Sequence, residues 1–466
     1  MSRINTNVSS LIAQRVLRRN NTSLNTSLER LSTGLKINKG ADNPAGLIAS
    51  ENLRAEKAGI AVAIENAERA SNIIGTAEGG LSEVSSLLIE LQGLVSQTAN
   101  SGGLSSEEVE ANQLQVDSIL NTINRIAQST AFQGTKLLNG NYDYTASGVN
   151  STSFDNVRVN AARIPDASTM NVVVEVVTSG QYGALTYATG DLTDNVTIEV
   201  AGNLGTEQLN FASGTSVSSI ADAVNAVTTV TGVSATVSGT DLVFTSTAYG
   251  ADQFVSVKTI TGTFAPDATK DYGQDAAVNI NGAAAQVSGL SVQYRSSNLD
   301  LEFDLDTTFN DAGTDSFAIT GGGATFALGS KISETDKAAI GIASVSTGSL
   351  GNTTLGYLSS LASGGANALG GENLVTAQRI IDKAVKQVSQ LRGRLGAFQR
   401  FTIGATVNSL GVAYENASAA ESAIRDTDFA AETSSLTRSQ ILAQAATTVL
   451  AQANASPQNA LRLLQG

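Results

Sequence analysis

The sequence contains no histidine, cysteine or tryptophan among its 466 residues. The lack of cysteine excludes disulfide bonds, and together with the lack of histidine it excludes thiolate and imidazole metal sites. The same two absences exclude the Ser–His and Cys–His pairs that activate many enzyme nucleophiles. Most enzyme classes are therefore excluded, and we expect neither catalytic activity nor a cofactor or metal ion.

Long hydrophobic runs and a cleavable leader are also missing. The longest apolar pieces, such as 171–177, fall far below the roughly 20 residues that a membrane-spanning helix needs. The first 20 residues carry four scattered arginines, without an uninterrupted apolar stretch or a small-residue cleavage site. We therefore expect no membrane span and no cleaved signal peptide. The arginines are too few in an acidic chain to indicate nucleic-acid binding.

The charge is distributed unevenly along the chain. Residues 141–350 hold 22 of the 42 acidic residues, 7 of the 28 basic residues and 16 of the 22 phenylalanines and tyrosines. The two ends are nearly neutral and rich in alanine, leucine, serine and glutamine. This pattern indicates helical ends that flank an acidic, β-rich insert.

Apolar spacing predicts long helices in both ends. Steps of three, four or seven residues continue across 53–95, which predicts one helix of more than forty residues. A second stripe covers 109–126, after a Ser-Gly-Gly break at 101–103, and a third covers 403–417. Two helices from the N-terminal part and one from the C-terminal part are therefore predicted to form a bundle.

Two narrower stripes lie at the extreme ends of the chain. We expect the first to stop at Asn43-Pro44 and the second to stop before Pro457, since proline disfavours helical backbone in the residue before it. Neither stripe has an obvious partner within one molecule except the other. Burial between subunits would explain both. The candidate assembly residues are Leu24, Leu28, Leu31, Leu35, Leu442, Ala446, Val449 and Ala453.

The middle of the chain reads as short strands. Strands are predicted at 171–177, 195–200, 233–237, 242–247 and 254–260, with a short helix at 217–227. The run 299–306 alternates leucine or phenylalanine with aspartate or glutamate, which places four carboxylates on one face of a strand. A divalent cation could bind there, but the EF-hand spacing is absent. We therefore favour a half-buried strand whose carboxylates face solvent.

Several motifs at the two ends resemble those of bacterial flagellins. They are Leu-Ser-Thr-Gly-Leu-Lys-Ile-Asn at 31–38, Ala-Asp-Asn-Pro-Ala-Gly at 41–46, Arg-Asp-Thr-Asp-Phe-Ala at 425–430 and Ser-Gln-Ile-Leu-Ala-Gln-Ala at 439–445. The likeness covers about 1–140 and 341–466. In the middle, 215–257 is similar to a small module of flagellin and hook-associated inserts, and 326–351 resembles the hairpin that returns the chain to the bundle.

The resemblance implies an α+β fold, in which both chain ends form a long discontinuous helical coiled-coil bundle that carries a β-rich inserted outer domain. It implies three domains: a terminal filament core at 1–45 and 426–466, a helical bundle with a β-hairpin at 46–146 and 321–425, and a variable surface insert at 147–320. The implied function is that of a structural subunit that polymerises into the flagellar filament used for swimming. A hook–filament junction protein is the alternative.

The resemblance also implies partners and a location. The partners would be copies of the chain itself, the flagellar export apparatus, a flagellin chaperone, and the hook-associated junction and cap proteins. The location would be the extracellular filament. Some relatives carry a zinc peptidase in the insert, but its His-Glu-x-x-His motif is impossible here. Glycan display or adhesion by the Ser- and Thr-rich insert remains open.

A last implication concerns immune detection. Flagellins recognised by the flagellin-sensing Toll-like receptor present an arginine within a leucine-rich stretch of the bundle. Leu88 and Leu94 match that stretch here, and Glu90 stands at the position of the arginine. A reversed charge in the centre of an interface weakens binding. Weak or absent receptor activation is therefore predicted.

Overall fold

The computed structural model describes residues 6–100, 103–164, 169–188, 190–371 and 373–465, with side chains as far as residue 455. These residues divide into two compact units. The first unit contains the described residues of Met1–Glu68, Ala327–Asp336 and Gly404–Gly466, and the second contains those of Arg69–Phe326 and Lys337–Ile403. Helix α2 (Pro44–Thr98) contributes residues to both.

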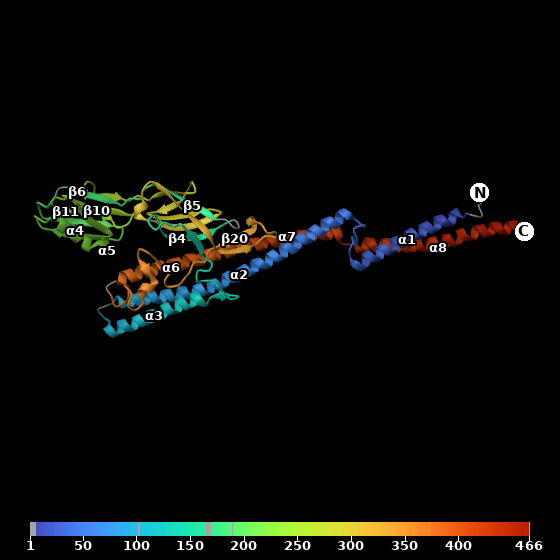
Figure 1. Cartoon of the computed structure of the whole chain (residues 1–466), viewed down its shortest axis with the longest axis horizontal. Helices are drawn as coiled ribbons and strands as arrows, with labels where there is room; N and C mark the ends of the chain where they lie inside the picture. Colours follow the sequence, from blue (N-terminus) through green and yellow to red (C-terminus); the bar gives the residue numbers. More distant parts are fainter. Residues whose placement is uncertain (1–5, 101–102, 165–168, 189, 372, 466) are drawn as a thin grey trace. The chain divides into compact units, whose positions relative to one another are not determined.

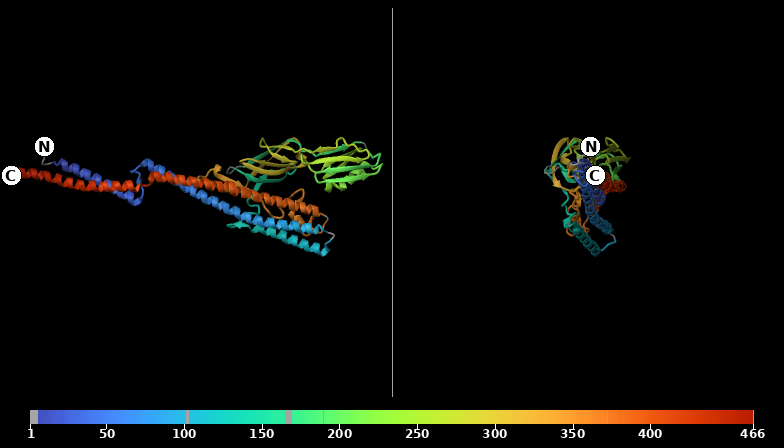
Figure 2. Two further views of the ribbon diagram at one scale, coloured as in Figure 1. Left: turned by 180° about the vertical axis from the view of Figure 1, so that it is seen from behind. Right: turned by 90° about the vertical axis from the view of Figure 1, so that its right-hand side faces the viewer.

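In the first unit, the two ends of the chain form a helix pair. Helices α1 (Val8–Thr33) and α8 (Phe429–Gln465) lie side by side, in blue and red in Figure 1 and Figure 2. The amide of Asn20 donates a hydrogen bond to the Leu442 carbonyl at 3.1 Å, and Arg30 forms an ion pair with Glu432 at 3.6 Å. Helix α7 (Ala405–Arg425) precedes α8.

Helix α1 ends earlier than the sequence pattern predicts. Gly34 adopts a left-handed conformation, with φ of 73°, and its N–H bonds to the Arg30 carbonyl. This is the usual way in which glycine terminates a helix. Leu35 therefore lies outside the helix, in an isolated β-bridge with Asp426. Pro44 instead opens α2, where its missing N–H costs no hydrogen bond.

The expected stop before Pro457 is wrong, because α8 continues to Gln465. A proline inside a helix cannot donate to the carbonyl four residues earlier, which here belongs to Ala453. The side-chain amide of Asn7 donates to that carbonyl at 2.7 Å. A residue 446 positions away thus replaces the missing hydrogen bond.

In the second unit, three helical segments pack as a bundle: the C-terminal part of α2, α3 (Ser106–Ser129) and α6 (Leu374–Ala397). Arg392 pairs with Glu78 at 3.0 Å, and Asn112 donates to Thr98 at 3.2 Å. The helices predicted from the stripes at 53–95 and 109–126 are confirmed. The C-terminal helix of this bundle is α6, however, whereas 403–417 falls in the end of a π-helix (Phe398–Gly404) and in α7.

The acidic insert contains two separate hydrophobic cores, and each core defines a module. The first β module is built from a five-stranded sheet, in the order β14-β13-β5-β18-β3, and a four-stranded sheet, in the order β15-β16-β17-β4. Phe154 lies at its centre and packs edge-on against Phe303 at 5.4 Å. Its strands are β3 (Tyr144–Ser147), β4 (Phe154–Ala162), β5 (Met170–Thr178), β13 (Ala277–Ile280), β14 (Ala283–Ala284), β15 (Gln286–Ser288), β16 (Ser291–Arg295), β17 (Leu299–Leu305) and β18 (Gly313–Gly322).

The second β module has sheets in the orders β6-β10-β9 and β12-β11-β7-β8, with two short helices. The predicted strands in the insert and the helix at 217–227 are confirmed within one or two residues. The elements of this module are β6 (Ala184–Tyr187), β7 (Val196–Gly202), β8 (Thr206–Phe211), α4 (Val217–Ala226), α5 (Thr228–Thr231), β9 (Val233–Ser238), β10 (Asp241–Ser246), β11 (Phe254–Thr261) and β12 (Lys270–Tyr272).

The remaining elements are short. The hairpin expected near 326–351 is present as β19 (Ala324–Ala327) and β20 (Lys337–Ile340). Two-stranded pairs also form between β1 (Ala131–Phe132) and β2 (Thr135–Lys136), and between β21 (Gly351–Asn352) and β22 (Gly356–Tyr357). Single 3-10 turns occur at Thr307–Phe309, Glu334–Asp336 and Leu358–Leu361. Within the described residues, every helix is too short or too polar to cross a bilayer.

Separate cores predict separate sensitivity to core mutations. Phe244 in the second β module is fully buried, so Phe244→Ala is expected to lower the free energy of unfolding of that module by about 3–5 kcal/mol. Hydrogen exchange of β7 and β10 would measure this loss. The same substitution at Phe401, which is 69% exposed, is the control. Equal loss of protection in the first β module would contradict two independent cores.

Candidate assembly surface

Small side chains form the buried contact between α1 and α8. On α1 these are Ser10, Ala13 and Ser27, and on α8 they are Ser439 and Ala446, each at most 7% exposed. Their spacing follows the three- and four-residue steps of a coiled-coil seam. Small residues let two helix backbones approach closely, but they bury little apolar area. The pair therefore gains limited stability from its own contact.

The eight predicted assembly residues divide into two groups around this seam. Ala446 lies in the seam, and Leu24, Leu31 and Ala453 are half-buried on the two helices. Leu35 is also half-buried, but it lies after the end of α1. The other three are exposed to solvent. They are Leu28, Leu442 and Val449, which are 46%, 47% and 57% exposed.

Further exposed apolar residues join these three on the outside of the pair. On α1 four of them cluster within residues 8–16, and Leu28 follows twelve residues later. We call the whole set the outer stripe. Its members are Val8, Leu11, Ile12, Val16 and Leu28 on α1, and Phe429, Ile441, Leu442 and Val449 on α8.

The connectors next to the helix pair are fixed by hydrogen bonds and charges. The N–H of Lys36 donates to the Arg425 carbonyl at 2.6 Å, and the N–H of Thr427 donates to the Gly34 carbonyl at 2.9 Å. Arg425 also pairs with Glu51 on α2 at 3.0 Å. The Arg54 guanidinium, and then Arg425, hold the pKa of Glu51 below its usual range. The segment between α1 and α2 and the segment between α7 and α8 are thus joined to each other by hydrogen bonds.

Comparison with known proteins finds family matches for both helical ends of the chain. The family model described as "Bacterial flagellin N-terminal helical region" matches residues 4–143, and "Bacterial flagellin C-terminal helical region" matches 378–464. Polar flagellin B/D of Vibrio parahaemolyticus is 30% identical over 465 residues, which are 99% of both chains. The chain belongs to the bacterial flagellin family.

Other comparisons agree with this assignment. Flagellin A of Vibrio cholerae is 31% identical, again over 99% of both chains. The family model "Flagellin hook IN motif" matches residues 195–248, which lie within the second β module. This range overlaps residues 215–257, the segment whose sequence is similar to a module of flagellin and hook-associated inserts. Among solved structures, FliC from Burkholderia pseudomallei covers 71% of this chain and 99% of its own, at 16% identity. The TM-score of this match is 0.24.

The three residues compared with the receptor-binding stretch of flagellins do not share one surface. Leu88 is fully buried and Leu94 is 8% exposed, both within the helical bundle. Glu90 is exposed on α2. The two leucines therefore pack inside the bundle, and of the three residues Glu90 alone is exposed.

Residues 299–305 of the alternating run form β17, with their apolar side chains buried as predicted. Asp306 lies after the strand and caps the 3-10 turn at Thr307–Phe309, so three carboxylates rather than four share the strand face. The carboxylates do not converge into a metal site: in the described part of the chain, no three acidic side chains are grouped as a metal ion requires. The carboxylates of this face are only partly exposed to solvent. Asp300, Glu302 and Asp304 are half-buried, and the last two line a pocket of about 90 Å³.

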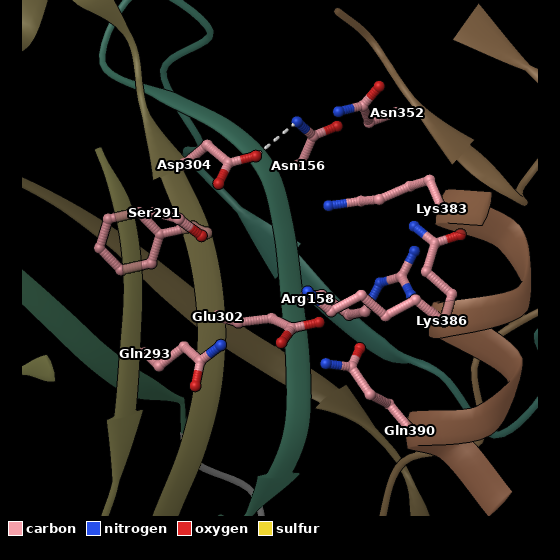
Figure 3. A pocket seen from close by; sticks show the side chains of 12 residues that line it. Asn156, Arg158, Ser291, Gln293, Glu302, Asp304, Asn352, Lys383, Lys386 and Gln390 are labelled. Carbon is pink, nitrogen blue, oxygen red and sulfur yellow. Dashed lines mark hydrogen bonds between the residues drawn. The ribbon is translucent and has the colours of Figure 1, made fainter. Parts of the chain in front are cut away.

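The other wall of this pocket is the polar side of α6. Lys383, Lys386 and Gln390 project from α6 toward Glu302 and Asp304 (Figure 3). These α6 residues recur at steps of three and four, so they share one helix face. The sequence pattern could not identify α6 as the neighbour, because it lies about eighty residues further along the chain.

Neighbouring side chains complete the contact between β17 and its surroundings. Asn156 donates to Asp304 at 2.9 Å, and Asn160 donates to Asp300 at 3.1 Å. Burial lowers the pKa of Arg394 on α6, while Glu302 and Asp300 oppose that shift. Acidic side chains of β17 and basic side chains of α6 therefore face each other across the pocket.

Reversing one charge on α6 tests this contact. Lys386→Glu places a carboxylate opposite Glu302 and Asp304, so it is expected to destabilise the second unit by about 0.5–1 kcal/mol, more at low salt. Thermal unfolding at two salt concentrations would measure the loss. Lys136→Glu, which changes an exposed lysine of β2, is the matched control. A salt-independent effect, or an equal effect in the control, would contradict an electrostatic contact.

Proposed function

We propose that the chain is a structural subunit that polymerises into the flagellar filament, and that the outer stripe is its main assembly contact. The observation that supports this proposal is the set of exposed leucine, isoleucine and valine side chains on α1 and α8. Contiguous exposed apolar residues mark surfaces that another protein covers. The family assignment makes a second copy of the chain the natural partner.

The hook–filament junction protein is the weaker alternative. Both full-length relatives named above are flagellins. The structural family also argues against an enzyme. We further propose an extracellular location in the filament, reached through the flagellar export apparatus with a flagellin chaperone and without a cleaved signal peptide. Contacts with the hook-associated junction and cap proteins at the filament ends belong to the same proposal.

The three-domain division remains part of this proposal. It assigns 1–45 and 426–466 to the filament core, 46–146 and 321–425 to the bundle, and 147–320 to the surface insert. The strand pairing between β3 and β18 supports the insert boundaries, since these strands close the first β module at residues 144–147 and 313–322. The candidate core residues named above then belong to one domain.

Folding of the terminal helices is proposed to be coupled to assembly. Ordering a residue costs about 1–2 kcal/mol of backbone entropy, and a seam of serine and alanine recovers little of it. Covering the outer stripe with a neighbouring subunit supplies the missing apolar burial. The isolated monomer is therefore expected to open this helix pair readily.

Charges in the outer stripe should block polymerisation without unfolding the subunit. Leu28→Asp or Val449→Asp would leave a carboxylate buried between subunits, while in the monomer both positions are exposed. We expect no filaments by sedimentation and electron microscopy, with the bundle of the second unit still folded. Asn21→Asp adds the same charge to α1 at an exposed polar position and should permit assembly.

Two results would contradict these proposals separately. Normal filaments from Leu28→Asp would exclude the outer stripe as the assembly contact. Slow amide hydrogen exchange across 24–33 in the isolated wild-type monomer would mean that α1 is already stably folded. Coupled folding would then be abandoned, while the contact itself would stand.

The identity of residue 90 is expected to limit immune detection. The wild-type monomer should activate the flagellin-sensing Toll-like receptor weakly, and Glu90→Arg should raise the response because it restores the arginine found in detected relatives. A receptor-reporter cell assay measures both. Glu65→Arg, at another exposed glutamate of α2, controls for added positive charge. A full response to the wild-type monomer would refute the hypothesis.

A further inference from the structure

Two tyrosines are stacked on each other in the second unit. The rings of Tyr182 and Tyr249 have centroids 3.7 Å apart and planes inclined by 28°. At that distance the facing ring carbons are in van der Waals contact. Tyr182 is 37% exposed and Tyr249 is half-buried, so solvent reaches the pair.

The surrounding backbone holds both rings at the joint between the two β modules. Tyr182 lies in the segment that leaves β5 of the first module for β6 of the second. Its neighbour Gln181 exchanges two backbone hydrogen bonds with Gln274, at 2.8 and 3.0 Å, where the chain returns. The N–H of Gly250, next to Tyr249, donates to the Gln181 carbonyl at 3.2 Å. The stack is therefore tied in place on both sides.

This pair is chemically distinct from the other aromatic contacts. Among the ring pairs of the described residues, it alone joins two phenols, since Tyr187 stacks on Phe264 and Tyr272 contacts Phe254. The chain has no cysteine, so no disulfide can link the two modules. Two phenols in contact offer another route to a covalent bond.

We propose that Tyr182 and Tyr249 are a site of oxidative modification, at which a haem peroxidase with hydrogen peroxide forms a dityrosine cross-link. Each phenol loses one electron and its hydroxyl proton, and the peroxide takes up two electrons and two protons to become two molecules of water. The two phenoxyl radicals then form one carbon–carbon bond between ring positions ortho to the oxygens. Each of those carbons returns its hydrogen to the oxygen of its ring, so the product is two linked phenols.

The local environment favours this coupling over escape of a single radical. Burial, together with the hydrogen bond and charge of the Tyr249 hydroxyl, raises the pKa of Tyr182 to about 12. Tyr182 is therefore a neutral phenol near pH 7. A radical formed on either ring already has its partner in contact, which gives the intramolecular reaction a large effective concentration.

The cross-link would close a loop that includes most of the second β module. Closing a long loop restricts the unfolded chain and raises thermal stability. The modified chain is therefore expected to unfold at a higher temperature in this module. An oxidised filament would gain a covalent link within each subunit, without any link between subunits.

The test uses the full-length monomer treated with a haem peroxidase and hydrogen peroxide. Peptide mass spectrometry is expected to find the peptides of Tyr182 and Tyr249 joined, with two hydrogens lost. The yield should not depend on protein concentration, as an intramolecular reaction requires. Tyr182→Phe and Tyr249→Phe should each abolish this product, while both variants keep a stacked ring and the fold.

Tyr272→Phe is the matched control, because Tyr272 is 58% exposed and its ring contacts Phe254 rather than a tyrosine. It should leave the Tyr182–Tyr249 product unchanged. Absence of that product from the folded wild-type monomer would overturn the proposal. So would a yield that rises with protein concentration, or an equal yield of links from Tyr272.

Discussion

A narrow helix pair cannot cover all of its own apolar side chains, and the organisation of this chain depends on that constraint. Each of α1 and α8 touches its partner along one side only, and that side carries serine and alanine. Leu24 and Leu31 are half-buried, while the exposed apolar residues of both helices form the outer stripe. Buried apolar area contributes about 25 cal/mol per Å², so the outer stripe stabilises nothing until another surface covers it. In the proposed filament, a second copy of the chain supplies such a surface.

The second unit satisfies the same constraint internally. Its three helical segments bury leucine and isoleucine completely, as at Leu81, Leu88 and Ile123. Each β module has a core of its own, with Phe154 and Phe303 in the first and Phe244 in the second. Its stability therefore comes from contacts within one molecule. A subunit can thus carry a folded body while its ends still require neighbours.

Local patterns predicted the elements of this fold better than its distant contacts. The period-two run at 299–306 predicted which side of β17 is buried, but not that its carboxylates would face the lysines of α6. The stop at Pro457 was wrongly expected because Asn7, from the other end of the chain, bonds the carbonyl that proline leaves free. Hydrophobic spacing selected Leu28 and Val449 and missed Ser10 and Ser27, since a seam of small polar residues has no hydrophobic signal.

The distribution of charge follows from assembly between identical copies. In an assembly of identical copies, each side chain at a contact faces the same side chains of the neighbouring copy. A net charge near the contact would therefore cause repulsion between neighbours at every such contact. The chain has a formal net charge of −14, yet its two ends together are close to neutral. The excess lies in residues 141–350, which include the acidic face of β17. Salt screens exposed charges beyond about 8 Å in physiological solution, so the remaining acidic surface acts only on close neighbours. Neutral ends therefore permit close helix contacts, while the insert carries the charge.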